Sequence, residues 1–213
     1  DTPEAITLSC FEPVRREVAR IALEKLIADG RIHPARIEEA IEKSRREVDA
    51  TIKQEGERAI LEAGVNGIHP ELVKLLGRLH YRTSYGQNVL DHSLEVSYLA
   101  GMMASELNID PAVARRAGLL HDIGRLRQYE DGIPHERSGL LLAEQILTAS
   151  GYEKQERRLV LRAIAQHRTA DPQGEGLDAL LYRADKRSRP CYFCRVQTFC
   201  HWPDERKNQT LIR

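Results

Sequence analysis

The stretch Gly118–Arg125, with the sequence GLLHDIGR, places two polar residues inside an apolar run. His121 and Asp122 follow two leucines and precede an isoleucine, so their surroundings have the composition of a protein core. Burying an imidazole or a carboxylate without a partner costs several kcal/mol. The rest of the chain must therefore supply partners for this pair, as hydrogen-bonding groups, opposite charges or a cation.

Helical patterns on both sides of this stretch predict an all-α chain. Asp110 and Pro111 are a typical N-cap and first-turn pair, so they are expected to begin the helix that carries GLLHDIG, and Gly124 is expected to end it. Other helices are expected over about 14–28, 34–63, 87–107, 136–150, 153–168 and 177–189 and from Pro70, with a polar loop, RTSYGQN, at 82–88.

The composition is that of a folded chain without a membrane span. Its 213 residues are 41% hydrophobic and 30% charged, and the formal net charge is zero. This balance excludes a global attraction to nucleic acid, so a polyanion site would have to be local. No apolar run approaches the ~20 residues of a span, no signal peptide is evident, and four cysteines do not make a disulfide scaffold. Because the first residue is Asp1, a fragment or a processed chain is expected.

A shift in composition near Gly64 and Gly67 predicts three segments. These are a strand remnant and charged helical arm over 1–66, a more apolar helical core over 67–190, and a cysteine-containing tail over 191–213. The arm carries apolar residues at a seven-like rhythm between charges. Such a pattern is typical either of a solvated amphipathic helix that packs on a neighbour or of a seam between two copies.

Two further polar residues fall on inward faces of predicted helices. His92 lies between Val89 and Val96 at helical spacing, and Asp185 lies four residues after Leu181. Taken singly, each has an ordinary interpretation, as a hydrogen-bonded core histidine or an ion-paired aspartate. Together with the first pair they form a natural ligand set for a divalent transition metal, namely His92, His121, Asp122 and Asp185.

Two more histidines can extend this set. His135 lies in a predicted loop and His167 lies near the end of a predicted helix. Six ligands suit a two-metal site bridged by one carboxylate, while mutual salt bridges and hydrogen bonds remain the alternative. Iron, manganese, zinc and nickel all accept nitrogen and oxygen ligands, so the residues do not choose among these metals.

The order of these residues resembles the HD superfamily of metal-dependent phosphohydrolases, whose most quoted signature is HDIG. The resemblance covers about 67–189 and implies an HD-domain helical bundle with an N-terminal helical arm. It also implies that His92, His121, Asp122 and Asp185 bind one or two divalent metal ions. Two-metal members have histidines placed like His135 and His167, with the aspartate of the motif as the bridge.

Residues 1 to about 125 more closely resemble the ribonuclease Y family, through segments such as DTPEAITLS, GRLHYRTSYGQNVLDHSLEVSYLAGMMASELN and ARRAGLLHDIG. That family comprises membrane-anchored bacterial endoribonucleases with a coiled coil, a KH RNA-binding domain and an HD domain. The resemblance implies hydrolysis of RNA phosphodiesters and a last KH strand over Asp1–Ser9. The expected location is the cytoplasm, with a membrane anchor if the chain is a fragment of such a protein.

The second half departs from that family. Arg125 stands where the family has a lysine, and GIPHERSG and AIAQHRTADP look more like small stand-alone HD hydrolases, some of which cleave dinucleoside polyphosphates. A nucleotide or dinucleoside polyphosphate is therefore the alternative substrate to RNA, and the zero net charge mildly favours it. A non-catalytic helical module, which forms a homodimer through the arm, is the alternative from another class.

The catalytic candidates are one ligand and three cations. Asp122 is expected to orient the nucleophile, and Arg125, Lys186 and Arg189 flank ligands in the sequence and can bind a phosphate group. The alternative for each cation is a solvated surface charge. Arg82 and Gln87, in the loop before the His92 helix, can either reach a substrate or pack the loop.

A second motif follows the last predicted helix. Cys191, Cys194 and Cys200 form a C-x2-C-x5-C pattern, with His201 adjacent. The C-x2-C pair allows two thiolates to bind one metal, and His201 or the remote Cys10 can supply a fourth ligand. A structural zinc site, an iron–sulfur cluster and free thiols in a packed tail all fit this pattern. Its position favours structural support over catalysis.

Overall fold

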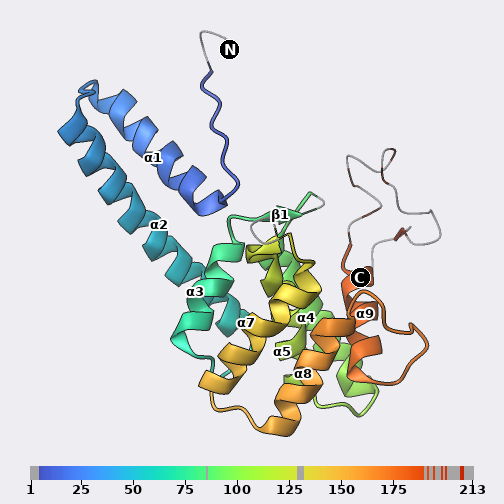
Figure 1. Cartoon of the computed structure of the whole chain (residues 1–213). Coiled ribbons are helices and arrows are strands. Elements are labelled where there is room, and N and C mark those ends of the chain that lie inside the picture. The colour runs from blue at the N-terminus through green and yellow to red at the C-terminus, as the bar shows by residue number, and fades with distance from the viewer. Residues whose placement is uncertain are drawn as a thin grey trace.

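The computed structural model describes residues 5–84, 86–128, 132–189, 191, 194, 198, 200 and 207–208. They form an all-α fold, as predicted, in which a helical hairpin projects from a helical bundle (Figure 1). No helix among the described residues is long and apolar enough to cross a membrane. The helices are α1 (Pro13–Asp29), α2 (Pro34–Ala63), α3 (Pro70–Leu79), α4 (Val89–Glu106), α5 (Pro111–Leu120), α7 (His135–Ala149), α8 (Lys154–Gln166) and α9 (Leu177–Arg187), with a 3-10 turn, η1 (Ile123–Leu126).

The predicted polar loop at 82–88 contains a short hairpin. Strands β1 (Thr83–Ser84) and β2 (Gln87–Asn88) are antiparallel, with Ser84 opposite Gln87. Helix α4 begins after this pair because the Asn88 side chain accepts hydrogen bonds from the backbone of Leu90 and Asp91, at 2.9 and 3.2 Å. The helix expected from residue 87 therefore starts at Val89.

The hairpin of α1 and α2, hereafter the arm, has a small core of its own. Ala22, Leu26 and Ala40 are its buried apolar residues, and Ile37 packs against them. Between the two helices the chain turns at Gly30, whose φ of 71° lies in the left-handed region that favours glycine. This turn is the tip of the arm and lies at the end that points away from the bundle (Figure 1).

The second half of α2 belongs to the bundle. Ala59 and Ala63 are fully buried in the main core. Upstream of them α2 crosses α3 at close range, since a Cβ on Gly56 would lie 2.0 Å from the carbonyl oxygen of Val73. One element thus links arm and core. The predicted boundaries at 66 and 190 remain a prediction.

The expected strand at the start of the chain is not formed by the described residues. Residues 5–10 have no regular secondary structure, and residues 1–4 lie outside the described part. A strand needs a partner for its backbone hydrogen bonds. Within the described ranges the sheet consists of β1 and β2 alone, which pair with each other.

The bundle is built around α4. This helix packs against α5 and α9, while α8 packs against α5, α7 and α9. Its interior is rich in leucine and isoleucine, and the largest fully buried side chains include Leu72, Leu76, Leu90, Leu119, Leu120, Ile123, Ile164, Leu180 and Leu181. This rigid core holds the ends of several helices close together, and the polar residues of interest lie at those ends.

Candidate metal centre

The HD pair lies in a turn rather than in a helix. Helix α5 ends at Leu120, and His121 and Asp122 lead into η1. The expectation that Gly124 ends this helix was therefore wrong. A Cβ at Gly124 would lie 2.0 Å from the carbonyl oxygen of His135, so the glycine instead allows η1 to contact the start of α7. This close approach brings the motif beside His135.

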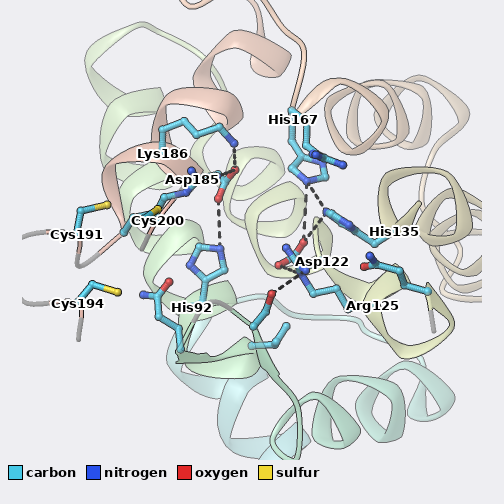
Figure 2. Close-up of a pocket in the computed structure, with 16 residues that line it drawn as sticks. His92, Asp122, Arg125, His135, His167, Asp185, Lys186, Cys191, Cys194 and Cys200 are labelled. Carbon is cyan, nitrogen blue, oxygen red and sulfur yellow. Dashed lines mark hydrogen bonds and ion pairs between the residues drawn. The ribbon is translucent and has the colours of Figure 1, made fainter. Parts of the chain in front are cut away.

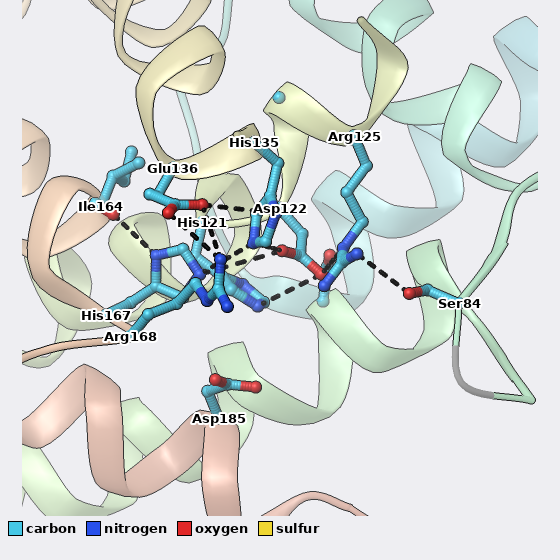
Figure 3. Close-up of polar contacts among 12 residues, drawn as sticks. Ser84, His121, Asp122, Arg125, His135, Glu136, Ile164, His167, Arg168 and Asp185 are labelled. Atoms are coloured by element: carbon cyan, nitrogen blue, oxygen red, sulfur yellow. Dashed lines mark hydrogen bonds and ion pairs between the residues drawn. The ribbon is translucent and has the colours of Figure 1, made fainter. Parts of the chain in front are cut away.

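The structure gathers all six predicted ligands from five parts of the fold; Figure 2 shows five of them and Figure 3 shows His121. One lies on α4 and one on α9, two lie in the turn after α5, one is the first residue of α7, and one directly follows α8. All are buried, with exposed fractions of 8% or less, and they are His92, His121, Asp122, His135, His167 and Asp185. The ends of the helices therefore assemble one cluster in the core.

The ligand atoms form two overlapping groups of three. Atoms of His92, His121 and Asp185 lie within 4.8 Å of one another, and so do atoms of His121, Asp122 and His167. The Asp122 Oδ1 atom lies 3.2 Å from His135 Nε2 and 4.0 Å from His167 Nε2, while Oδ2 lies 3.7 Å from His121 Nε2. Asp122 thus lies between three imidazoles (Figure 3).

Two of the imidazoles are oriented by backbone hydrogen bonds. Nδ1 of His121 donates to the carbonyl oxygen of Gly118 at 2.7 Å, and Nδ1 of His167 donates to that of Ile164 at 2.6 Å. A proton on Nδ1 leaves the Nε2 lone pair free to accept or ligate. Both Nε2 atoms point into the cluster, so these rings present the atom that a metal needs.

Three buried polar atoms in the cluster lack hydrogen-bond partners among the described residues. They are Nε2 of His121, Oδ1 of Asp122 and Nδ1 of His135. Leaving such groups unpaired costs about 1–3 kcal/mol each, and more for a charged group. A divalent cation between His121 Nε2 and Asp122 Oδ1 would satisfy these two atoms, so the donor set fits a metal.

Burial sets the protonation of the inner histidines. Loss of solvation lowers the pKa of His121 to about 3 and that of His135 to about 4, and it also lowers the pKa of His167. These three rings are therefore neutral at pH 7. Neutral imidazole is the form that binds a metal.

Both aspartates remain ionised although they are buried. Burial raises the pKa of Asp122, but the adjacent histidine and Arg125 outweigh it, and the pKa lies below its ordinary value. For Asp185, burial is outweighed by the contact with His92 and by the Lys186 ammonium, and the pKa lies well below its ordinary value. The cluster thus offers two carboxylates and neutral imidazoles at pH 7.

Arg125 contacts the motif aspartate. Its Nε donates to Asp122 Oδ2, and its Nη1 donates to Ser84 Oγ at 2.9 Å (Figure 3). The guanidinium is therefore held between η1 and the β1–β2 hairpin. This geometry makes Arg125 a group that positions Asp122, in addition to a cation on the cavity wall.

The other two predicted cations contact the second aspartate. Lys186 Nζ forms an ion pair with Asp185 Oδ2, and Arg189 Nη2 lies 3.7 Å from the same oxygen. Burial lowers the pKa of Lys186. Both residues also line the cavity, so neither is only a solvated surface charge.

The ligands open onto a cavity of about 210 Å³. Its wall combines ligands, cations and polar residues, and it is lined by Ser84, Gln87, Val89, His92, Asp122, Arg125, Gln128, His135, His167, Arg168, Asp185, Lys186, Arg189, Cys191, Cys194 and Cys200. Of the two loop residues considered as substrate contacts, Gln87 lines this cavity. Arg82 is buried and donates to the carbonyl oxygen of Leu126 at 2.9 Å, which supports the loop-packing interpretation.

Sequence reasoning missed three supporting residues. Ser84 holds Arg125 and Arg168 lines the cavity, and neither has a signal in the sequence. Ser188 Oγ lies 3.2 Å from His92 Nδ1 and donates to the carbonyl oxygen of Asp185 at 2.9 Å. Its position three residues after Asp185, at the C-cap of α9, was a signal that could have found it.

The cysteine motif lies beside this site. Cys191, Cys194 and Cys200 are half-buried free thiols on the cavity wall, whereas Cys10 is exposed. His201, predicted as a further ligand, lies outside the described residues. The thiols share the cavity of the candidate metal centre, and their role in structural support stays a prediction.

Comparison with known proteins agrees with this geometry. Residues 89–189 match the HD domain family. A crystal structure described as a predicted HD superfamily hydrolase, from an uncultured Thermotogales bacterium, is similar with a TM-score of 0.51 and 24% identity. The similarity covers 64% of this chain and 79% of that one, and it confirms the fold alone.

Curated relatives extend the similarity to the arm. Ribonuclease Y of Clostridium tetani is 58% identical over 184 residues, which are 86% of this chain and 34% of that protein. Ribonuclease Y of Clostridium novyi is also 58% identical, over 86% of this chain and 35% of its own length. The chain therefore spans about a third of the length of the curated relatives that it matches.

Proposed function

We propose that this chain hydrolyses a phosphoester, with an RNA phosphodiester as the first choice of substrate. The observation that carries the proposal is the pair of ligand groups His92, His121, Asp185 and His121, Asp122, His167. Within each group the ligand atoms lie within 4.8 Å of one another, and the two groups share His121. Two adjacent divalent ions are a common arrangement in phosphatases and nucleases, where they stabilise the attacking and leaving oxygens. Iron, manganese, zinc and nickel all suit this donor set.

The ligand roles follow from position. His92, His121 and Asp185 would hold one ion. Asp122, His135 and His167 would hold a second, with Asp122 as the bridge. When bound, such metals lower the pKa of a coordinated water from ~15.7 toward ~7 and so supply a nucleophile at neutral pH.

The cations of the cavity complete the site. Arg125 orients the Asp122 carboxylate through its Nε and is braced by Ser84. Lys186 and Arg189 form ion pairs with the other carboxylate, Asp185, and line the same cavity. Donors held on both sides of a cavity can bind the non-bridging oxygens of a phosphate group and stabilise the charge that develops during hydrolysis.

Two observations favour different substrates. The curated relatives named ribonuclease Y support RNA, since they match 86% of this chain at 58% identity. The zero formal net charge favours a smaller substrate, such as a nucleotide or a dinucleoside polyphosphate, because it gives the chain no global attraction to a polyanion. The cavity of about 210 Å³ lies below the ~300–1,000 Å³ of typical small-molecule pockets, so either substrate would place its phosphate group inside and extend beyond the cavity.

The test is a substrate screen with a matched histidine control. Chelator-treated protein is reconstituted with manganese, iron, zinc or nickel and assayed on single-stranded RNA, cyclic dinucleotides, nucleoside monophosphates and dinucleoside polyphosphates. We expect RNA cleavage that falls at least a hundredfold in His121→Ala and is unchanged in His33→Ala, an exposed position on the arm. If no phosphoester is hydrolysed with any metal, or if His121→Ala is as active as the wild type, the proposal is wrong.

We also propose that the arm joins two copies of this chain. Large apolar residues are exposed on or beside it, namely Phe11 at 88%, Ile27 at 59% and Ile32 at 67%. The arm's own core is too small to cover them, and a second arm would bury them. Light scattering of the wild type should give twice the monomer mass. The double variant Ile27→Lys with Ile32→Lys should give the monomer mass. A wild type with the monomer mass contradicts the proposal.

A further inference from the structure

A further cation, Arg168, lines the cavity beside the three that were predicted. Each of the predicted cations contacts a candidate metal ligand, either Asp122 or Asp185. Arg168 instead forms an ion pair with Glu136, which is not one of the six candidate ligands. Arg168 is therefore held apart from the carboxylates of the metal centre, and its charge is available for another purpose.

The backbone and the side chain of Arg168 are both fixed. Its backbone belongs to the turn that ends α8, where the N–H groups of Thr169 and Ala170 donate to the carbonyl oxygen of Gln166, at 2.9 and 2.8 Å. Its Nη1 donates to Oε1 and Oε2 of Glu136, in the first turn of α7, at 3.1 and 3.2 Å (Figure 3). Two helices thus hold the guanidinium in place before a ligand binds, which lowers the entropic cost of binding.

The guanidinium keeps donors for a ligand. Both bonds to Glu136 use Nη1, whereas a guanidinium has five N–H donors, and its planar fork matches the oxygens of a phosphate group. The side chain of Arg168 is 48% exposed although it lines the cavity, so it lies at the mouth. The six candidate ligands lie deeper, since each of them is buried.

Positive charges from two helix ends meet in this cavity. Burial lowers the pKa of Lys186 most, and the positive charges of Arg189 and Arg168 lower it further. All three side chains line the same cavity, so their charges act on one space. An anion in that space offsets their mutual repulsion, and the partly buried surroundings strengthen its attraction to them.

The size of the cavity indicates which part of a substrate reaches Arg168. In the proposed site, the phosphate group that is hydrolysed lies at the six buried ligands. Because the cavity of about 210 Å³ is smaller than typical small-molecule pockets, the rest of the substrate extends through the mouth. In a nucleoside polyphosphate the next group along is another phosphate, and in RNA a second phosphate follows one nucleoside later.

We propose that Arg168, held by Glu136, binds a second phosphate group of the substrate, next to the one that is hydrolysed. The proposal rests on the proposed phosphoester site and deepens it, because it selects substrates with two neighbouring phosphate groups over those with one. Arg168 is then a residue that determines specificity, and Glu136 is a positioning residue that acts through it.

The test compares ligands with one and two phosphate groups in matched arginine variants. Binding of AMP and of α,β-methylene-ADP, whose P–C–P bridge resists hydrolysis, is measured by calorimetric titration of the metal-loaded protein. The control is Arg162→Met, which removes an exposed arginine that donates to Asp178 at 3.0 Å outside the cavity. We expect the wild type and Arg162→Met to bind α,β-methylene-ADP ~10-fold or more tightly than AMP, and Arg168→Met to bind the two ligands about equally.

A second arm uses RNA dinucleotides, namely ApA and its 5′-phosphorylated form pApA, as substrates. Arg168→Met should raise the KM for pApA to that for ApA and leave kcat unchanged, because uniform binding is lost. Arg168→Lys should recover part of the discrimination, since an ammonium keeps the charge but not the fork. Glu136→Gln should weaken discrimination less than Arg168→Met. A purely structural ion pair would instead affect both ligands of each pair alike.

Each outcome decides the proposal. A preference for two phosphates in the calorimetric arm alone identifies a nucleoside polyphosphate, and a preference in the dinucleotide arm alone identifies RNA. The proposal is overturned if the wild type shows no preference in either arm, or if Arg168→Met keeps the preference of the wild type. Loss of the calorimetric preference in Arg168→Met, in a protein that hydrolyses no phosphoester, would support this phosphate site and contradict the proposed function alone.

Discussion

The contact at Gly124 predicts that one added methyl group disturbs the candidate metal centre. In Gly124→Ala the new Cβ would lie 2.0 Å from the carbonyl oxygen of His135 and 2.5 Å from the backbone nitrogen of Gly139. Both atoms belong to the backbone of α7, so neither can rotate away. Real Cβ contacts do not fall below 3.0 Å, so η1 and α7 must separate by about 1 Å.

This separation acts on two measurable quantities. Overpacking of this kind costs ~1–3 kcal/mol, and each kcal/mol lowers the Tm of a chain of this size by ~2–4 °C, so we expect a fall of ~2–12 °C. The same movement carries Asp122, two residues earlier, away from His135. Metal sites tolerate only ~0.2 Å in ligand distance, so metal affinity should fall much more than stability alone explains.

Calorimetry and metal titration of three glycine variants test this reasoning. Gly30→Ala, on the arm, forces an alanine to a φ of 71° but meets no atom within 4 Å, so it should lower stability by ~1 kcal/mol and leave metal affinity unchanged. Gly139→Ala, whose Cβ would lie 3.2 Å from Gly124, should have a milder effect than Gly124→Ala. Wild-type Tm and metal affinity in Gly124→Ala would refute the argument.

Three other predictions follow from the contacts of the site. Ser188→Ala removes the hydroxyl beside His92 Nδ1 and should lower metal affinity by ~10–100-fold in a titration. Unchanged affinity would contradict the role of Ser188 in positioning His92. Arg125→Lys keeps a cation beside Asp122 and should retain more hydrolytic activity than Arg125→Met, and equal loss in both would show that charge at this position is not what matters. Removal of metal with a chelator should lower the Tm, because a ligand at a hundred times its Kd stabilises the folded state by ~2.7 kcal/mol. A Tm that does not rise again when metal is restored would contradict metal binding to the folded state.

Local features made the helices predictable. Capping pairs such as Asp110–Pro111 and stops such as Gly30 act within one turn, so their effect can be read from neighbouring residues. The strand expected over Asp1–Ser9 failed within residues 5–9 for the opposite reason. A strand depends on a partner that no local pattern specifies.

The sequence by itself determined the fold class, the inward faces of the helices and the identity of the six candidate ligands. Periodicity and residue chemistry are local, and His92 and Asp185 could be found from their apolar neighbours alone. Only the tertiary structure decided how these residues meet. It placed Asp122 between three imidazoles, tied Arg125 to Ser84, and brought Cys191, Cys194 and Cys200 to the same cavity. These contacts join residues far apart in the chain, and the packing of whole helices sets their distances.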